Sequence, residues 1–221
     1  MKKRIAVLIS GSGSNLQAII DSIDGQLINA EIVSVISNKI DAYGLERAAL
    51  AGIETLVLQH THFKSRSAFD QALLSHLEQC KVDLIILAGF MRILTAEFVE
   101  HFSGMMLNIH PSLLPKYKGL DTHQRALDAG DKQHGCSVHF VTPELDGGPV
   151  ALQAIVSINT TENTQSLQQK VHKAEHIAYS KVVAWFCSDK LKCIDNKLFL
   201  EGELLPATGF QFYHPGQQER C

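Results

Sequence analysis

A short apolar run leads into a glycine-rich turn near the start of the chain, where Ile5 to Gln17 reads IAVLISGSGSNLQ. Consecutive apolar residues are typical of a strand that is buried on both faces, and the amphipathic stretch from Asn15 to Ser22 is typical of a helix. A buried strand, a tight turn and a helix in this order open a βαβ unit, whose strands run parallel. The stretch therefore predicts a wound α/β sheet.

The rest of the chain continues this alternation of short apolar runs and amphipathic stretches. Further strands are expected at Glu31–Ser37, Thr55–Leu58, Leu84–Ala88, Met105–Ile109, Ser137–Val141 and Val150–Val156. Further helices are expected at Leu45–Ala51, Arg66–Gln79, Thr95–His101, His123–Ala129 and Thr164–Trp185. The last two strands form a hairpin in this interpretation. We expect an α/β fold with a Rossmann-like, wound, mixed sheet of about seven strands, mostly parallel, with helices on both faces.

Composition limits the class of protein. The chain has 221 residues, of which 45% are hydrophobic and 19% charged, and its net charge is -3. An acidic chain without a basic patch argues against a partner that is a nucleic acid or a membrane surface. The five cysteines form no Cys-x-x-Cys pair, so we expect reduced thiols. The first apolar run is too short for a signal peptide, so a cytoplasmic protein is expected.

One compact domain is expected over residues 1–209, because a chain of this size can bury a single core. Residues 210–221 are polar and show no periodicity, so a loosely ordered tail is expected there.

The glycine-rich turn is a candidate phosphate site. Glycines allow close approach of an anion, and a helix N-terminus offers unpaired N–H groups and a partial positive charge. The third glycine of a dinucleotide fingerprint is replaced by Leu16, which argues against a dinucleotide-dependent dehydrogenase. Gly13, Ser14 and Asn15 suit a single terminal phosphate better. The alternative is a tight turn capped by Ser14 or Asn15, which needs no ligand.

A second motif places an amide and an imidazole two residues apart, in Asn108-Ile109-His110-Pro111. Alternate residues of a strand share a face, so Asn108 and His110 could both donate hydrogen bonds to one developing oxyanion. Asp146 lies in a turn-prone loop and could fold back to hold the charged form of the histidine. These three residues indicate an acyl-transfer site without a nucleophilic serine or cysteine. Each residue also has an explanation without a site: Asn108 as a turn former, His110 as a histidine at a strand end, and Asp146 as an acidic residue of a loop.

The segment from His172 to His176 has the His-x-x-Glu-His pattern of some zinc proteases. A third ligand would have to come from Glu201, Glu203 or Glu219, and this support is weak. We therefore expect no metal.

Several of these segments together resemble one family. Gly11 to Gln17, Ser37 to Lys39, Leu87 to Leu94, Asn108 to Pro115 and Asp146 to Gly148 occur in this order over a resemblance that runs from about Arg4 to Leu200. The chain is similar to the phosphoribosylglycinamide formyltransferases (glycinamide ribonucleotide transformylases), folate-dependent members of the formyltransferase superfamily. The resemblance implies transfer of a formyl group from 10-formyltetrahydrofolate, a cosubstrate, to the amine of glycinamide ribonucleotide in purine biosynthesis.

The resemblance also implies a phosphate or ribonucleotide side in the N-terminal half of the domain, and a folate side with a catalytic loop in its C-terminal half. It implies roles for residues by matching position. The catalytic residues would be Asn108, His110 and Asp146, and the ribonucleotide would contact Gly13, Ser14, Asn15, His172 and Glu175. His172 departs from the residues usual at its position in the family. The folate would contact Arg66, Met91, Arg92, Ile93, Leu94, Asn108, Thr142, Pro143, Glu144, Leu145 and Asp146. The expected partners are these two small molecules, in a monomer or a homodimer.

Two other functions remain open. A formyltetrahydrofolate deformylase, which is a hydrolase, has related core residues, although it carries an extra domain before its catalytic part. A non-catalytic nucleotide-binding module would explain the glycine-rich turn but would leave Asn108, His110 and Asp146 without a purpose.

Overall fold

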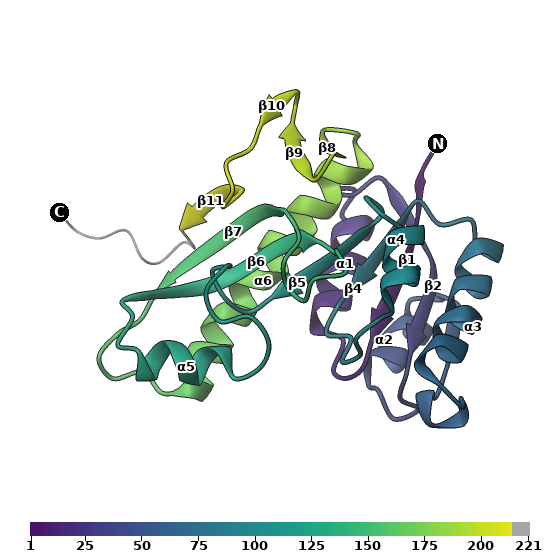
Figure 1. Ribbon diagram of the computed structural model, residues 1–221, viewed down its shortest axis with the longest axis horizontal. Coiled ribbons are helices and arrows are strands. Elements are labelled where there is room, and N and C mark those ends of the chain that lie inside the picture. The colour runs from purple at the N-terminus through teal and green to yellow at the C-terminus, as the bar shows by residue number, and fades with distance from the viewer. Residues whose placement is uncertain (214–221) are drawn as a thin grey trace. The chain divides into compact units, whose positions relative to one another are not determined.

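The structure is a computed structural model, and it describes residues 1–213. The chain forms two compact units (Figure 1). Unit 1 contains Met1–Asn108 and Val141–Pro143, and unit 2 contains Ile109–Phe140 and the described chain from Glu144 onward. Within the described residues, no helix has both the length and the apolar character needed to cross a membrane.

Unit 1 is built on parallel strands. In space their order is β5 (Met106–His110), β4 (Leu84–Leu87), β1 (Lys3–Ile9), β2 (Ala30–Ser37) and β3 (Thr55–Val57), and the last two residues of β5 belong to unit 2. The chain runs outward from β1 through β2 to β3, and then returns to continue from β4 to β5 on the other side. The strand order thus reverses between β1 and β4, which is the topological switch point where open α/β sheets bind ligands.

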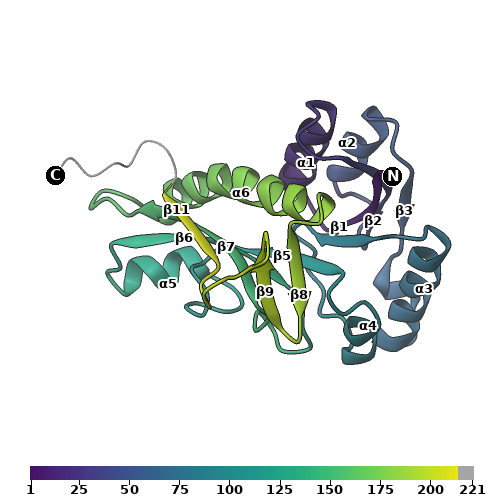
Figure 2. The same cartoon turned by 90° about the horizontal axis from the view of Figure 1, so that it is seen from above.

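Helices cover both faces of the unit 1 sheet. Helices α1 (Ser14–Asp24) and α2 (Gly44–Leu50) lie on one side, and α3 (Arg66–Gln79) and α4 (Ala96–His101) lie on the other (Figure 2). A short 3-10 helix, η1, spans His60–His62. Strand residues such as Leu8 and Ile85 pack with Phe69 and Leu73 of α3 and Phe98 of α4 in one buried cluster. Burial of these apolar side chains stabilises the packing of α3 and α4 on the sheet.

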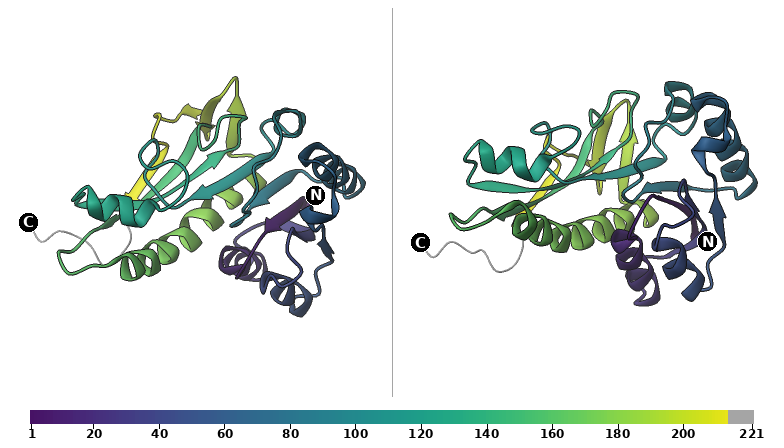
Figure 3. Two further views of the ribbon diagram at one scale, coloured as in Figure 1. Left: turned by 60° about the horizontal axis from the view of Figure 1, so that its bottom comes forward. Right: turned by 90° about the horizontal axis from the view of Figure 1, so that it is seen from below.

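Unit 2 contains an antiparallel hairpin of β6 (Gln133–Phe140) and β7 (Val150–Ser157). The long helix α6 (Thr164–Cys187) runs along this hairpin (Figures 2 and 3) and begins with a capping box formed by Asn163 and Ser166. Helix α5 (Thr122–Asp128) precedes β6. A small antiparallel sheet follows α6, with strands β8 (Leu191–Ile194), β9 (Lys197–Leu200) and β10 (Glu203–Leu204). Strand β11 (Phe210–Tyr213) then pairs parallel with β7.

The predicted α/β class and the mixed, mostly parallel sheet are confirmed, but the small sheet of β8 to β10 is not predicted, and three further features differ. The main sheet has eight strands and not about seven, because β11 joins it. Strand β6 begins four residues earlier than Ser137, because Gln133 to Cys136 pair with the end of β7. The expectation of a loose tail from residue 210 is wrong for Phe210–Tyr213, which form β11, and residues 214–221 lie outside the described chain.

Candidate active site

Strand β5 presents Asn108 and His110 at its end. Ile109, between them, is buried, and the alternation of a strand places Asn108 and His110 on one face. Asn108 is half-buried and aligns with Leu87 of β4, while His110 is buried. Both side chains therefore stand at the carboxyl end of a parallel strand, the edge at which open α/β sheets bind ligands.

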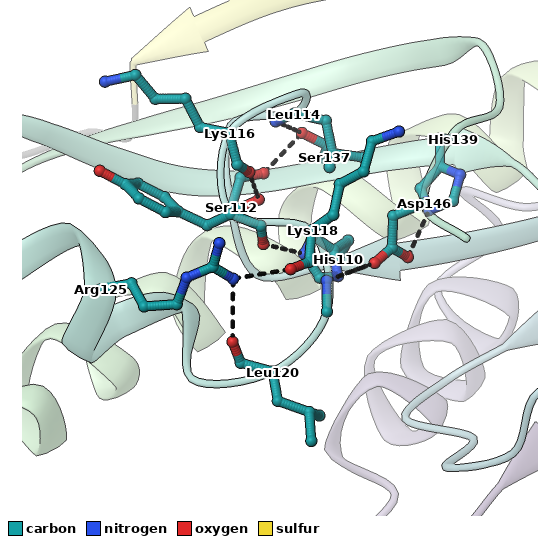
Figure 4. Close-up of polar contacts among 12 residues, drawn as sticks. His110, Ser112, Leu114, Lys116, Lys118, Leu120, Arg125, Ser137, His139 and Asp146 are labelled. Carbon is teal, nitrogen blue, oxygen red and sulfur yellow. Dashed lines mark hydrogen bonds and ion pairs between the residues drawn. The ribbon is translucent and has the colours of Figure 1, made fainter. Parts of the chain in front are cut away.

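His110 is held through both ring nitrogens (Figure 4). Its Nδ1 lies 3.4 Å from Asp146 Oδ2, and its Nε2 donates to the carbonyl oxygen of Tyr117 at 2.9 Å. The side chains of His110 and Asp146 are only 7% and 8% exposed. Both oxygen atoms can only accept, so the two contacts are favourable together when both nitrogens carry a proton. The sequence predicts the approach of Asp146 to His110, but it does not predict the contact with Tyr117.

Besides His110, Asp146 contacts the backbone N–H of Gly119 and the side chain of His139. Its backbone is left-handed, with φ 47°, in the tight loop between β6 and β7. Its Oδ2 accepts from Gly119 N–H at 2.9 Å, and its Oδ1 lies 3.8 Å from His139 Nε2. Burial lowers the pKa of His139 to about 4, and its Nδ1 donates to Phe140 O, so this imidazole is neutral at pH 7. Sequence reasoning missed His139, whose only signal was its place two residues after Ser137 on an expected strand.

The segment after His110 is fixed to the hairpin by hydrogen bonds (Figure 4). Ser137 Oγ donates to Ser112 O at 2.7 Å and accepts from Leu114 N–H at 3.0 Å. Gln153 Nε2 donates to Leu114 O at 2.8 Å. Arg125 of α5 donates to Lys118 O at 2.7 Å. These bonds set the position of the Tyr117 carbonyl against His110.

The glycine-rich turn forms the N-terminus of α1. Gly13 is the residue before the helix and has φ 69°, and neither Ser14 nor Asn15 caps the helix with its side chain. A Cβ at position 13 would lie 2.6 Å from Gly44 Cα, so the close approach of α2 requires glycine there. Because Gly13 occupies the N-cap position without a side-chain cap, the expected cap by Ser14 or Asn15 is wrong, and phosphate binding at this turn stays a prediction. Three expected phosphate contacts (Gly13, Ser14 and Asn15) lie together at the first turn of α1, whose N–H groups suit an anion.

The expected folate residues fall into both units. Unit 1 holds Arg66, the first residue of α3, and the segment Met91–Leu94 between β4 and α4, as well as Thr142 and Pro143. Met91 and Ile93 expose 68% and 58% of their surface, while Leu94 is buried. Unit 2 holds Glu144, Leu145 and Asp146, and Glu144 pairs with Lys118 Nζ at 2.7 Å.

Helix α6 carries the other expected ribonucleotide residues. Glu175 is buried at 4% exposure, and His172 is half-buried. The charge of His172 acts on His123 of α5, so His172 lies near that imidazole. Among residues 1–213, no group of three or more His, Cys, Asp or Glu side chains could hold a metal ion.

Comparisons with known proteins agree on one family. A family model described as formyl transferase matches residues 3–183. The phosphoribosylglycinamide formyltransferase of Escherichia coli is 50% identical over 93% of this chain and 97% of its own length. A trifunctional purine biosynthetic protein of Drosophila melanogaster is 51% identical over 83% of this chain and 14% of its own length. The solved phosphoribosylglycinamide formyltransferase of Coxiella burnetii superposes with a TM-score of 0.93 at 49% identity, over 96% of this chain and all of that one.

Proposed function

The chain belongs to the formyl transferase family, and on that premise we propose that it transfers a formyl group from 10-formyltetrahydrofolate to the amine of glycinamide ribonucleotide, in purine biosynthesis. The observation that supports this most is the pair Asn108 and His110 at the end of β5, with Asp146 3.4 Å from the imidazole. Hydrogen-bond donors with a supporting carboxylate suit acyl transfer to an amine, which needs no protein nucleophile.

The reaction begins when the neutral amine of the ribonucleotide attacks the formyl carbon. A C–N bond forms, the carbonyl π electrons move to oxygen, and Asn108 and His110 donate to that oxygen. The amine nitrogen then loses a proton, the folate nitrogen gains one, and the bond between the formyl carbon and the folate nitrogen breaks. Asp146 accepts from His110 Nδ1 and so favours the donor form of the ring.

The contact of His110 with Tyr117 bears on this mechanism. In the structure the Nε2 proton is directed to Tyr117 O at 2.9 Å. For His110 to donate to the formyl oxygen through Nε2, the Tyr117 carbonyl has to move away or share this proton. The segment from Ser112 to Leu120 is thus part of the catalytic apparatus in this proposal.

The substrates have separate subsites in the proposal. Gly13, Ser14 and Asn15 bind the ribonucleotide phosphate, and His172 and Glu175 bind the rest of that substrate. The folate uses Arg66, Met91 to Leu94 and Thr142 to Asp146. Residues 1–209 act as one catalytic domain, since β5 continues from unit 1 into unit 2. The proposed enzyme is a cytoplasmic monomer or homodimer that requires no metal.

An assay of the purified protein tests the proposed reaction. Incubation with 10-formyltetrahydrofolate should release tetrahydrofolate only when glycinamide ribonucleotide is added, and a chelator should leave the rate unchanged. Asn108→Ala should lower turnover by roughly two to three orders of magnitude, the usual effect of losing an oxyanion donor. Formation of tetrahydrofolate without added ribonucleotide would favour the deformylase. Binding of the ribonucleotide without turnover would favour the non-catalytic module.

A further inference from the structure

The segment Met91–Leu94 leaves the switch point of the unit 1 sheet without regular secondary structure. It follows β4 after Gly89, whose φ is 73°, and it ends at Thr95, the residue that caps α4. Met91 and Ile93 are largely exposed, whereas Arg92 lies over the Phe69 ring at 5.1 Å and Leu94 is buried in the unit 1 core, so packing holds only part of the segment. If such a loop becomes ordered only when its ligand binds, the loss of conformational freedom lowers the affinity for that ligand.

Ser10 holds the first end of this segment. Met91 N–H donates to Ser10 Oγ at 2.8 Å, and the Ser10 hydroxyl donates to Asn38 Oδ1 at 2.6 Å. Because the hydroxyl proton is used on Asn38, the oxygen lone pairs are directed to Met91. Ser10 and Asn38 are 5% and 3% exposed, so water competes little with either bond. These bonds span the sheet at its switch point, from the end of β1 and the loop after β2 to the loop after β4.

Asp70 holds the other end. Its Oδ2 accepts from Thr95 N–H at 2.6 Å, and the residue, in the first half of α3, is only 4% exposed. A charged acceptor makes this a short, strong hydrogen bond. The segment is therefore fixed at both ends by buried side chains that lie far from it in the chain.

We propose that Ser10, through Asn38, and Asp70 are positioning residues that hold Met91–Leu94 in the conformation that binds folate. The inference rests on the proposed function, because it assigns the ligand of the segment from that function. Ser10 also immediately precedes Gly11 of the glycine-rich turn, so one buried residue supports both expected subsites in unit 1.

Steady-state kinetics of matched variants test the proposal. Ser10→Ala and Asp70→Ala should each raise the KM for 10-formyltetrahydrofolate by about five- to tenfold, the scale of one lost hydrogen bond, with kcat changed less than about twofold. Asp70→Asn keeps a carbonyl oxygen for Thr95 N–H but loses the charge, so its KM should lie between those of the wild type and Asp70→Ala. The control is Ser34→Ala, which removes another buried hydroxyl of unit 1, bonded to His76 at 3.0 Å, and should leave the KM unchanged.

Lower melting temperatures with an unchanged folate KM in both alanine variants would overturn the proposal and leave only a structural role. If Ser10→Ala does not fold, the comparison of Asp70→Ala with Asp70→Asn decides alone. Calorimetric titration with tetrahydrofolate separates this inference from the proposed function. Absence of ribonucleotide-dependent turnover in the wild type contradicts the function, whereas equal tetrahydrofolate affinity in the wild type and both alanine variants contradicts the positioning roles.

Discussion

Asp146 contacts three groups of the candidate site, namely the side chains of His110 and His139 and the backbone N–H of Gly119. Asp146→Asn keeps the shape but removes the charge and one acceptor oxygen, so His110 loses support for its protonated form. We expect kcat to fall by about a hundredfold or more, and the folate KM to rise much less than kcat falls, because Asp146 is also an expected folate contact. Asp121→Asn is the matched control, because Asp121 is also left-handed, with φ 57°, and its side chain caps no helix. A higher folate KM with normal kcat would instead make Asp146 a loop organiser.

A pair of buried histidines should make stability depend on pH. His123 Nδ1 lies 3.2 Å from His134 Nε2, and burial, with smaller effects of neighbouring histidines, lowers the pKa of each to about 4. The unfolded chain binds protons near pH 6.5 and the folded protein only near pH 4. The stabilisation is therefore complete above pH 6.5, decreases as the pH falls, and is lost near pH 4.

Urea unfolding between pH 7.5 and 4.5 measures this effect. His123→Asn keeps a hydrogen-bonding amide near the position of Nδ1 but removes one titrating group. The slope of the unfolding free energy against pH should then decrease by up to about 1.4 kcal/mol per pH unit. An unchanged slope would show that His123 does not titrate differently in the folded and unfolded states.

At the scale of elements, β11 is held by both of its faces. Phe210 and Phe212 surround Lys181 Nζ of α6, at 4.9 and 5.7 Å from the ring centroids, and Gln211 donates to Gln153 of β7 at 2.8 Å. Gly209 begins this arrangement with φ 67°, and a Cβ there would lie 2.6 Å from Val150 O. The strand can therefore pair with β7 only if residue 209 is glycine.

Gly209→Ala should detach β11, whereas Gly202→Ala should not. Both glycines have positive φ, but a Cβ at position 202 meets no atom within 4 Å. Gly202→Ala should cost about 1 kcal/mol from backbone strain alone, and Gly209→Ala should cost more because backbone atoms also overlap. Hydrogen exchange of the Phe210–Tyr213 amides measures the difference. Equal protection in the two variants would contradict the proposed requirement for glycine.

The sequence predicts those helices and strands in which apolar residues form a continuous run or recur at a regular spacing. Strand β1 and helix α1 follow from the apolar run and the glycine turn, and α3 was predicted with its observed bounds. The sequence does not predict strands β8 to β10, because they are short and only two of their residues are buried. It does not predict β11, because the alternation of Phe210 and Phe212 is too brief. The same limit applies to the site. Chemistry singled out Asn108, His110 and Asp146, whereas His139 and the Tyr117 carbonyl depend on tertiary contacts that no local pattern encodes.

At the scale of the whole molecule, the expected binding segments share one topological position. The glycine-rich turn follows β1 and the segment Met91–Leu94 follows β4, the two strands between which the order of the unit 1 sheet reverses. Asn108 ends the part of β5 that belongs to unit 1, and His110 follows it in unit 2. In a wound sheet, the loops at this position do not pair with a strand. The N–H and C=O groups of these loops are therefore free to bind ligands.

Separate subsites predict separate effects of the two ligands on stability. A ligand at a hundred times its Kd stabilises the folded protein by about 2.7 kcal/mol, so each substrate should raise the melting temperature of the wild type. Asn15→Ala removes one expected phosphate contact at the N-terminus of α1, so it should reduce the shift produced by glycinamide ribonucleotide. The shift produced by tetrahydrofolate should remain. Asn29→Ala, an exposed asparagine of the same unit before β2, is the control and should retain both shifts. Equal loss of both shifts in Asn15→Ala, or loss of neither, would contradict the assignment of the phosphate to this turn.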